Sequence, residues 1–340
     1  MTKIFEDDGF AVEQIQEPKN VRDVVYSLIT NPNLAPVNYF NDFTEEGPIL
    51  EDIAVDEGGL FTTDSGQKLA MTTHAFDRHL ETSPQTAIEI LITRATRRLV
   101  CYGIRPVAVS AFLYHLNIGD PKGDKIAAAA KKGMERAASA FGLQISERKI
   151  RFDCSPAGRN PSATLIVSMM GLVENINKIL DHKLKKKGNN IFVIGESVND
   201  INSSEYLEFH CGIPNSPLPY FDLDKEVRMI ATVRQLIDRQ LITSANPIGR
   251  GGLFFSLMRA AMPMGVGFDI TTDAEIRKDA FLFGESMGRG FVGVPQENFD
   301  RFVDFMQEQR IPFFAVGHVT SGEIRIDSES FGFIDKMKVH

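Results

Sequence analysis

The sequence has 340 residues, 43% of them hydrophobic and 24% charged, which excludes a disordered or fibrous chain and predicts about two globular domains. The net charge of −8 argues against a nucleic-acid partner, because binding a polyanion requires a basic surface. Cys101, Cys154 and Cys211 are widely spaced, so they predict neither a disulfide framework nor a zinc site and fit a reducing cytoplasm.

The hydropathy pattern predicts no contact with a membrane. Residues 1–8 are acidic and lack the apolar segment of a signal peptide. No uninterrupted apolar run reaches the length that crosses a bilayer. We therefore expect an unexported protein in the cytoplasm.

The first half of the chain alternates strand and helix patterns. Residues 1–36 contain three prolines and predict an irregular or helical preface. Beyond them, strands are expected at 59–63, 68–72, 106–113 and 162–172. Apolar residues at helical spacing predict a long helix from about 88 to 100, ending near Gly103, and a second helix over 123–141.

A second mixed block follows the basic run 183–187. Strands are expected at 191–194, 290–294, 312–319 and 323–327, and helices near 225–240, 253–262 and 296–309. Two consecutive mixed blocks predict an α/β (α+β) protein with domains at 37–182 and 188–340.

A polar, glycine-rich turn at residues 243–252 leads directly into the predicted helix at 253–262. Unpaired N–H groups and the dipole at a helix start favour an anion, so Gly249, Arg250, Gly251 and Gly252 are candidates for binding a phosphate. The alternative is a tight turn before a core helix, because the spacing matches no P-loop or dinucleotide motif.

The order of several short motifs resembles phosphoribosylformylglycinamidine synthase, the glutamine-dependent ligase of purine biosynthesis. In the second block the motifs are 194–197 (Ile-Gly-Glu-Ser), 203–206 (Ser-Ser-Glu-Tyr), the turn at 244–253, 283–286 (Phe-Gly-Glu-Ser) with Arg289, and 316–320 (Val-Gly-His-Val-Thr). In the first block they are 97–109, 116–121 and 171–174. The resemblance covers about residues 38 to 330 and extends to aminoimidazole ribonucleotide synthase, selenophosphate synthetase and thiamine-phosphate kinase.

The resemblance implies a two-domain aminoimidazole ribonucleotide synthase-like fold. Its N-terminal domain pairs with a partner's to form a barrel, and its C-terminal domain is a mixed α/β domain. A separate chain of this size implies a homodimer. The implied ligands are ATP and a phosphorylated ribonucleotide-type small molecule.

Both blocks depart from the family at positions that carry chemistry. The family's turn reads Ser-Ala-His-Asp-x-Ser-Asp/Glu-Gly-Gly-Leu, whereas this chain has Asn246, Pro247, Gly249 and Arg250 at the His, Asp, Ser and acidic positions. Such a loop cannot move a proton in the family's way, although Arg250 suits a phosphate.

The predicted long helix has Arg94 and Arg98 where the family has the Glu and Asn that hold magnesium-nucleotide. Hard cations prefer carboxylate oxygens, so Mg²⁺ stays open as a cofactor although its usual ligands are replaced, and no metal ligand is assigned. Arg94 and Arg98 are instead candidates for binding the nucleotide's polyphosphate. Asn117 and Asp120, in the matched loop at 116–121, are the other nucleotide-binding candidates.

Four acid or base residues remain as weak catalytic candidates. His74 and Asp77 lie near the family's nucleotide or substrate contacts, and Glu205 and Glu285 lie in matched motifs. The alternative for the two glutamates is a structural carboxylate that caps a helix or loop.

Two functions therefore follow from the resemblance. One is ATP-dependent ligase chemistry that converts an amide to an amidine, or a divergent form of it. The other is a catalytically degenerate homologue that acts as a nucleotide-binding or assembly subunit.

Overall fold

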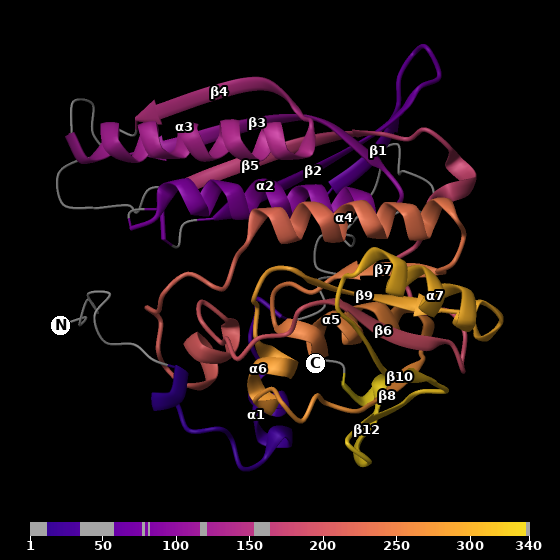
Figure 1. Cartoon of the computed structure of the whole chain (residues 1–340). Helices are drawn as coiled ribbons and strands as arrows, with labels where there is room; N and C mark the ends of the chain where they lie inside the picture. The colour runs from indigo at the N-terminus through magenta and orange to yellow at the C-terminus, as the bar shows by residue number, and fades with distance from the viewer. Residues whose placement is uncertain are drawn as a thin grey trace, which may run out of the picture. The chain divides into compact units, whose positions relative to one another are not determined.

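The computed structural model describes residues 12–34, 58–76, 79–80, 82–115, 121–152 and 164–337. The chain divides into two compact units. The first unit comprises residues 49–179 and 223–234, and the second unit comprises residues 1–48, 180–222 and 235–340 (Figure 1).

The first unit contains a five-stranded sheet in the order β1-β2-β5-β3-β4. The strands are β1 (Gly58–Thr62), β2 (Lys68–Phe76), β3 (Arg105–His115), β4 (Gln144–Phe152) and β5 (Thr164–Leu172). Neighbours are antiparallel except β3 and β4, which are parallel. A 3-10 turn, Ile176–Lys178, follows the sheet.

Helices α2 (Pro84–Cys101) and α3 (Pro121–Phe141) pack on one face of this sheet. The apolar faces of the two helices pack against every second residue of the strands, including Val109, Leu165 and Val167. The two helices approach closely at Gly133, where an added Cβ would lie 2.3 Å from the carbonyl oxygen of Gln85.

Helix α4 (Leu223–Asp238) begins in the first unit. There, Arg97 of α2 and Glu226 of α4 form an ion pair at 3.1 Å, with 2% and 0% of their side chains exposed. Cys101 is buried close to this pair, and burial raises its pKa to about 11, so its thiol stays protonated at neutral pH.

The second unit contains a seven-stranded sheet in the order β12-β11-β8-β10-β6-β9-β7. The strands are β6 (Asn190–Gly195), β7 (Ser244–Pro247), β8 (Gly267–Ile270), β9 (Arg289–Val294), β10 (Phe313–Thr320), β11 (Glu323–Ile326) and β12 (Glu329–Phe333). β8 and β11 are parallel, and the other pairs are antiparallel.

The helices of the second unit are α1 (Val21–Ile29), α5 (Gly252–Ala261), α6 (Lys278–Phe283) and α7 (Phe299–Gln309), with a π-helix at Tyr206–His210. Short 3-10 turns lie at Val12–Gln14, Met262–Met264, Gln296–Asn298 and Ile334–Met337. A cluster of buried phenylalanines, including Phe254, Phe268 and Phe283, forms the centre of the core.

Helix α1 is part of this core. Its side chains Val24, Val25 and Leu28 are completely buried in the same cluster as α5 and α6. Asn20 caps its N-terminus by accepting a hydrogen bond from the amide of Arg22. The preface predicted from the sequence thus contains a helix that the second unit needs to complete its core.

The expected α/β architecture, with mixed strands and helices in each block, is confirmed. Several elements were not predicted: β4, β7, β8, β12 and α6. Among the described residues, no helix is long and apolar enough to cross a membrane.

Candidate functional site

The glycine-rich turn opens a helix, as expected. β7 ends at Pro247, and α5 begins at Gly252 with Gly251 as its N-cap. Gly251 and Gly252 have φ angles of 80° and 71°, which favour glycine. A Cβ on Gly252 would also lie 2.5 Å from the carbonyl oxygen of Leu282. The turn therefore depends on these two glycines.

Three backbone amides of the turn, those of Gly249, Gly251 and Gly252, have acceptors within the chain. Gly249 donates to Ser256 Oγ at 3.4 Å, and Gly252 donates to the carbonyl oxygen of Gly249 at 2.9 Å. The amide of Gly251 donates to Glu285 Oε1 at 2.8 Å. The anion that the helix start favours is thus supplied by the chain itself, as a carboxylate.

Glu285 also connects the turn to Glu205. Its Oε1 atom accepts a second hydrogen bond, from the backbone amide of Glu205, at 2.8 Å. The two glutamates are buried, with 5% and 4% of their surfaces exposed. Arg250 Nε lies 3.6 Å from Glu205 Oε1, and the Arg250 side chain is 55% exposed. The structure thus brings together Glu205, Arg250, Gly251 and Glu285.

Three residues that the sequence did not point to complete this cluster. Asn31 donates from Nδ2 to Glu205 Oε2 at 2.8 Å, and Asn33 Nδ2 lies 3.2 and 3.3 Å from the two Glu205 oxygens. Leu34 packs against Gly251, where an added Cβ would lie 2.8 Å from Leu34 Cδ2. Asn31 and Asn33 are 174 and 172 residues from Glu205 in the chain, so no local motif signals the contact.

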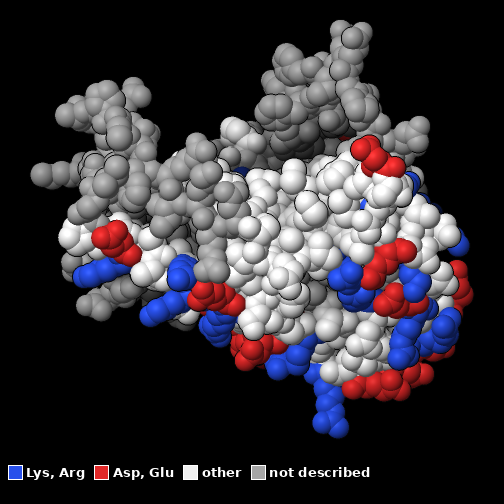
Figure 2. All heavy atoms as spheres, turned by 90° about the horizontal axis from the view of Figure 1, so that it is seen from above, with Lys and Arg blue, Asp and Glu red and all other residues white. Residues whose placement is uncertain are grey.

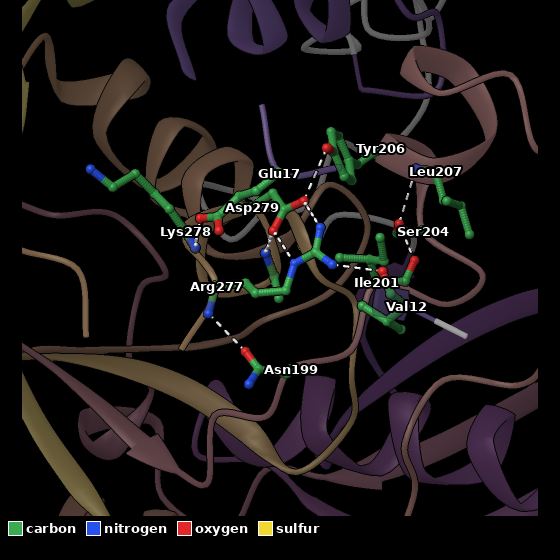
Figure 3. Close-up of polar contacts among 11 residues, drawn as sticks. Val12, Glu17, Asn199, Ile201, Ser204, Tyr206, Leu207, Arg277, Lys278 and Asp279 are labelled. Atoms are coloured by element: carbon green, nitrogen blue, oxygen red, sulfur yellow. Dashed lines mark hydrogen bonds and ion pairs between the residues drawn. The ribbon is translucent and has the colours of Figure 1, made fainter. Parts of the chain in front are cut away.

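The residues on either side of Glu205 are fixed by hydrogen bonds (Figure 3). Ser204 Oγ donates to the carbonyl oxygen of Ile201 and accepts from the amide of Leu207 at 3.1 Å. Tyr206 donates from its hydroxyl to Asp279 Oδ2 at 3.1 Å. Burial, together with the charge of Asp279, raises the pKa of Tyr206, so the hydroxyl stays protonated and donates.

Asp279 is held in turn by Arg277, and the N-terminal segment contacts Arg277 and Lys278. Arg277 forms two hydrogen bonds to Asp279, at 3.0 and 2.7 Å, and a third to the carbonyl oxygen of Val12 at 2.6 Å. Glu17 accepts from the amide of Lys278 at 2.8 Å. Figure 3 shows these groups converging beside α6. The segment that carries Asn31 and Asn33 is therefore anchored at its start as well.

The remaining candidates lie in the first unit or outside the described residues. His74 Nε2 is 3.0 Å from Thr72 Oγ1. Arg94 and Arg98 are half-buried, one turn apart on α2, and Arg98 lies over the ring of Tyr102 with its Cζ 5.6 Å from the centroid. The other three candidates, Asp77, Asn117 and Asp120, lie outside the described residues. Among the residues that the structure describes, no group of three or more His, Cys, Asp or Glu could hold a metal ion.

A family model supports the resemblance found in the motifs. Residues 186–327 match the model described as "AIR synthase related protein, C-terminal domain". This range contains the glycine-rich turn and both glutamates of the cluster.

Several curated proteins similar to the chain are subunits of phosphoribosylformylglycinamidine synthase. The phosphoribosylformylglycinamidine synthase subunit PurL of Caldanaerobacter subterraneus subsp. tengcongensis is 26% identical over 330 residues, covering 95% of this chain and 45% of that protein. The same subunit of Moorella thermoacetica is 27% identical, covering 90% and 42%. The chain thus spans about half the length of the curated relatives it matches.

Solved structures show the same fold. Thermotoga maritima PurL complexed with FGAR superposes with a TM-score of 0.72 at 15% identity, covering 95% of this chain and 54% of that chain. Thermotoga maritima PurL complexed with ATP gives 0.66 at 14% identity, covering 83% and 46%. Thiamine monophosphate kinase from Aquifex aeolicus gives 0.57 at 14% identity, covering 82% and 93%. At these identities the likeness establishes the fold alone.

Proposed function

Because the chain is related to phosphoribosylformylglycinamidine synthase and has an aminoimidazole ribonucleotide synthase-like fold, we propose that it works in purine biosynthesis. In this proposal it has ATP-dependent ligase chemistry of that kind, or a divergent form of it, in the cytoplasm. The main support is the cluster at the start of α5, where four residues from three matched motifs, Glu205, Arg250, Gly251 and Glu285, meet.

The proposed reaction has two steps. The oxygen of an amide substrate attacks the γ-phosphorus of ATP, and ADP leaves. Ammonia then adds to the activated carbon and inorganic phosphate leaves, giving an amidine. The protein's main task is to stabilise charge around the transferring phosphoryl group.

We assign the phosphate contact to the exposed guanidinium of Arg250. The amides of Gly249, Gly251 and Gly252 already have acceptors, whereas Arg250 is more than half exposed and meets Glu205 only at 3.6 Å. A guanidinium binds phosphate oxygens through two parallel hydrogen bonds. In this assignment, the role of Gly249, Gly251 and Gly252 is to give the turn the conformation that exposes Arg250.

Nucleotide binding in the first unit is assigned to Arg94 and Arg98 on α2, and to Asn117 and Asp120. The described residues do not fit a magnesium site of the usual kind, because arginines stand at the positions of the carboxylate and amide ligands and hard cations prefer oxygen ligands. We therefore assign no step to Mg²⁺. His74 and Asp77 remain candidates for substrate contacts.

A second function, a nucleotide-binding or assembly subunit without catalysis, is favoured by Asn246. This residue stands at the position of the family's histidine, and it is 6% exposed with its amide donating to the carbonyl oxygen of His182 at 2.9 Å. A side chain used in this way holds the backbone and cannot act as an acid or base.

A homodimer is part of the proposal, and the open face of the first unit's sheet supports it. Phe61, Met71, Tyr114 and Met170 are 37% to 45% exposed. Met71 pairs with Met170 in register, and the alternation of strand side chains places all four on the face away from α2 and α3. Figure 2 shows one face of the molecule, on which a broad area without charged side chains lies between charged ones.

Calorimetric titration with ATP, with and without Mg²⁺, tests the function. The ligase proposal predicts ATP binding that Arg94→Ala weakens by about tenfold, the size expected for one charge-assisted contact. Arg301→Ala, which removes an exposed arginine of α7, is the matched control and should bind as the unmodified protein does. An intact dimer that binds no ATP would favour the assembly function instead.

A further inference from the structure

Asn31 and Asn33 compete with Arg250 for one carboxylate. Both asparagine amides hydrogen bond to Glu205, at distances of 2.8 to 3.3 Å. Arg250 reaches the same carboxylate only at 3.6 Å, which is longer than a hydrogen bond. Two uncharged donors thus bond to the oxygens of Glu205 more closely than the cation that lies beside them.

The uncharged donors matter because Glu205 is buried and its position is fixed. Its backbone amide donates to Glu285, and its neighbours Ser204 and Tyr206 are held by the contacts of Figure 3. A buried carboxylate needs hydrogen-bond donors. Without the asparagine amides, the guanidinium of Arg250, whose Nε is already 3.6 Å from Oε1, can move to donate to this carboxylate.

We propose that Asn31 and Asn33 are positioning residues that satisfy Glu205 and thereby keep the guanidinium of Arg250 available to an anionic ligand. The inference rests on the proposed phosphate contact of Arg250. It assigns residues from the N-terminal segment to the anion site of the second unit, where Leu34 also packs against Gly251.

The conformation of residues 31–34 supports this role. Asn31 Oδ1 accepts from the amide of Asn33 at 2.9 Å, and the amide of Leu34 donates to the carbonyl oxygen of Asn31 at 2.9 Å. The segment directly follows α1, whose apolar side chains are buried in the core. The side chain of Asn31 and the backbone of residues 31–34 are therefore held in place by local hydrogen bonds and by a packed helix.

The first test treats the whole protein with phenylglyoxal, a reagent for arginine side chains. Mass spectrometry then measures the rate at which Arg250 is modified. Asn33→Ala should slow modification of Arg250 by about fivefold, because the guanidinium then pairs with Glu205. Adding Glu205→Gln to Asn33→Ala should restore the rate. Asn33 is exposed, and Asn31→Ala is the second variant if Asn33→Ala fails to fold. Asn177→Ala, an exposed asparagine of the first unit, is the matched control.

The second test is the affinity for inorganic phosphate, measured by calorimetric titration, which should weaken by about fivefold in Asn33→Ala and recover with Glu205→Gln. An unchanged rate of Arg250 modification in Asn33→Ala would overturn the inference. So would a slower rate that Glu205→Gln does not restore, since that would indicate a merely structural effect. If the unmodified protein binds no ATP, the proposed function fails, but the modification rates still decide whether the asparagines control Arg250.

Discussion

At the scale of single residues, the anion-favouring start of α5 is satisfied internally. Glu285 accepts hydrogen bonds from the amides of both Gly251 and Glu205. The alternative considered for the glutamates, a structural carboxylate, therefore describes Glu285 well, since its position stabilises the turn. Arg250 is the group of the turn that remains exposed to a ligand.

Asp327 gives a residue-level prediction about pH. Burial alone would raise its pKa, but hydrogen bonds from Lys278 and from the amide and hydroxyl of Thr272 together lower it. An aspartate with a lowered pKa stabilises the fold above its ordinary pKa, and that stability is lost as the pH falls through the folded-state value. Asp327→Asn should therefore cost about 1 to 2 kcal/mol at pH 7, and less below about pH 4.

Urea unfolding across this pH range measures the effect. Asp335→Asn, which changes an exposed aspartate of the same unit, should alter the free energy of unfolding by less than about 0.5 kcal/mol. A cost for Asp327→Asn that is equally large at pH 3 and pH 7 would contradict the assignment.

The site was predictable from sequence only in part. The motifs pointed to Glu205, Glu285 and the glycine-rich turn, and the structure brings these together. Asn31 and Asn33 were missed because their contact with Glu205 joins distant parts of the chain. The same holds for Arg277, whose carbonyl partner Val12 is 265 residues away.

At the scale of elements, periodicity identified the long amphipathic helices and the buried strands well. The buried residues of α2 and α3 lie at the predicted helical spacing because the sheet covers one face of each helix. β4 was missed because, within the described part of the chain, it is the edge strand next to β3, and its residues 146–149 are polar or charged, as edge strands often are. α6 has only six residues and is buried on nearly every side, so it shows no helical stripe.

The contact between α2 and α3 gives an element-level prediction. Gly133→Ala adds a Cβ that would lie 2.3 Å from Gln85 O and 2.6 Å from Ile88 Cγ2. Alanine gains about 1 kcal/mol of helix propensity, but separating two packed helices costs about 1 to 3 kcal/mol. Because the closest atom is backbone, we expect net destabilisation of about 1 kcal/mol.

The measurement is the free energy of unfolding by guanidinium chloride. Ser139→Ala, at an exposed position of α3, is the control and should change stability by less than about 0.5 kcal/mol. A Gly133→Ala variant more stable than the unmodified protein would show that the helices can separate without cost.

At the scale of the whole molecule, the open sheet face of the first unit predicts self-association. Met170→Glu places a charge among Phe61, Met71 and Tyr114, and burying that charge in a dimer interface is costly. We expect the dimer to dissociate at protein concentrations at least about tenfold higher than for the unmodified chain.

Light scattering coupled to size-exclusion chromatography measures this change. Gln67→Glu carries the same charge at the exposed turn between β1 and β2 and should leave the dimer intact. A chain that is monomeric without any substitution would contradict the prediction, as would a Met170→Glu variant that dimerises normally.

The docking of α1 has a consequence for how the protein matures during synthesis. Arg22 donates to Glu329 and to the carbonyl oxygen of Ser330 and lies over the ring of Phe331, so this first helix meets β12, made 307 residues later. Until the ribosome has released the hairpin of β11 and β12, these contacts of Arg22 cannot form, and the core cluster that contains Val24, Val25 and Leu28 lacks Phe331. Contacts between residues so far apart in the chain form slowly. Apolar side chains that stay exposed until then favour aggregation or chaperone binding. The second unit must therefore complete its folding late, after translation has passed β12.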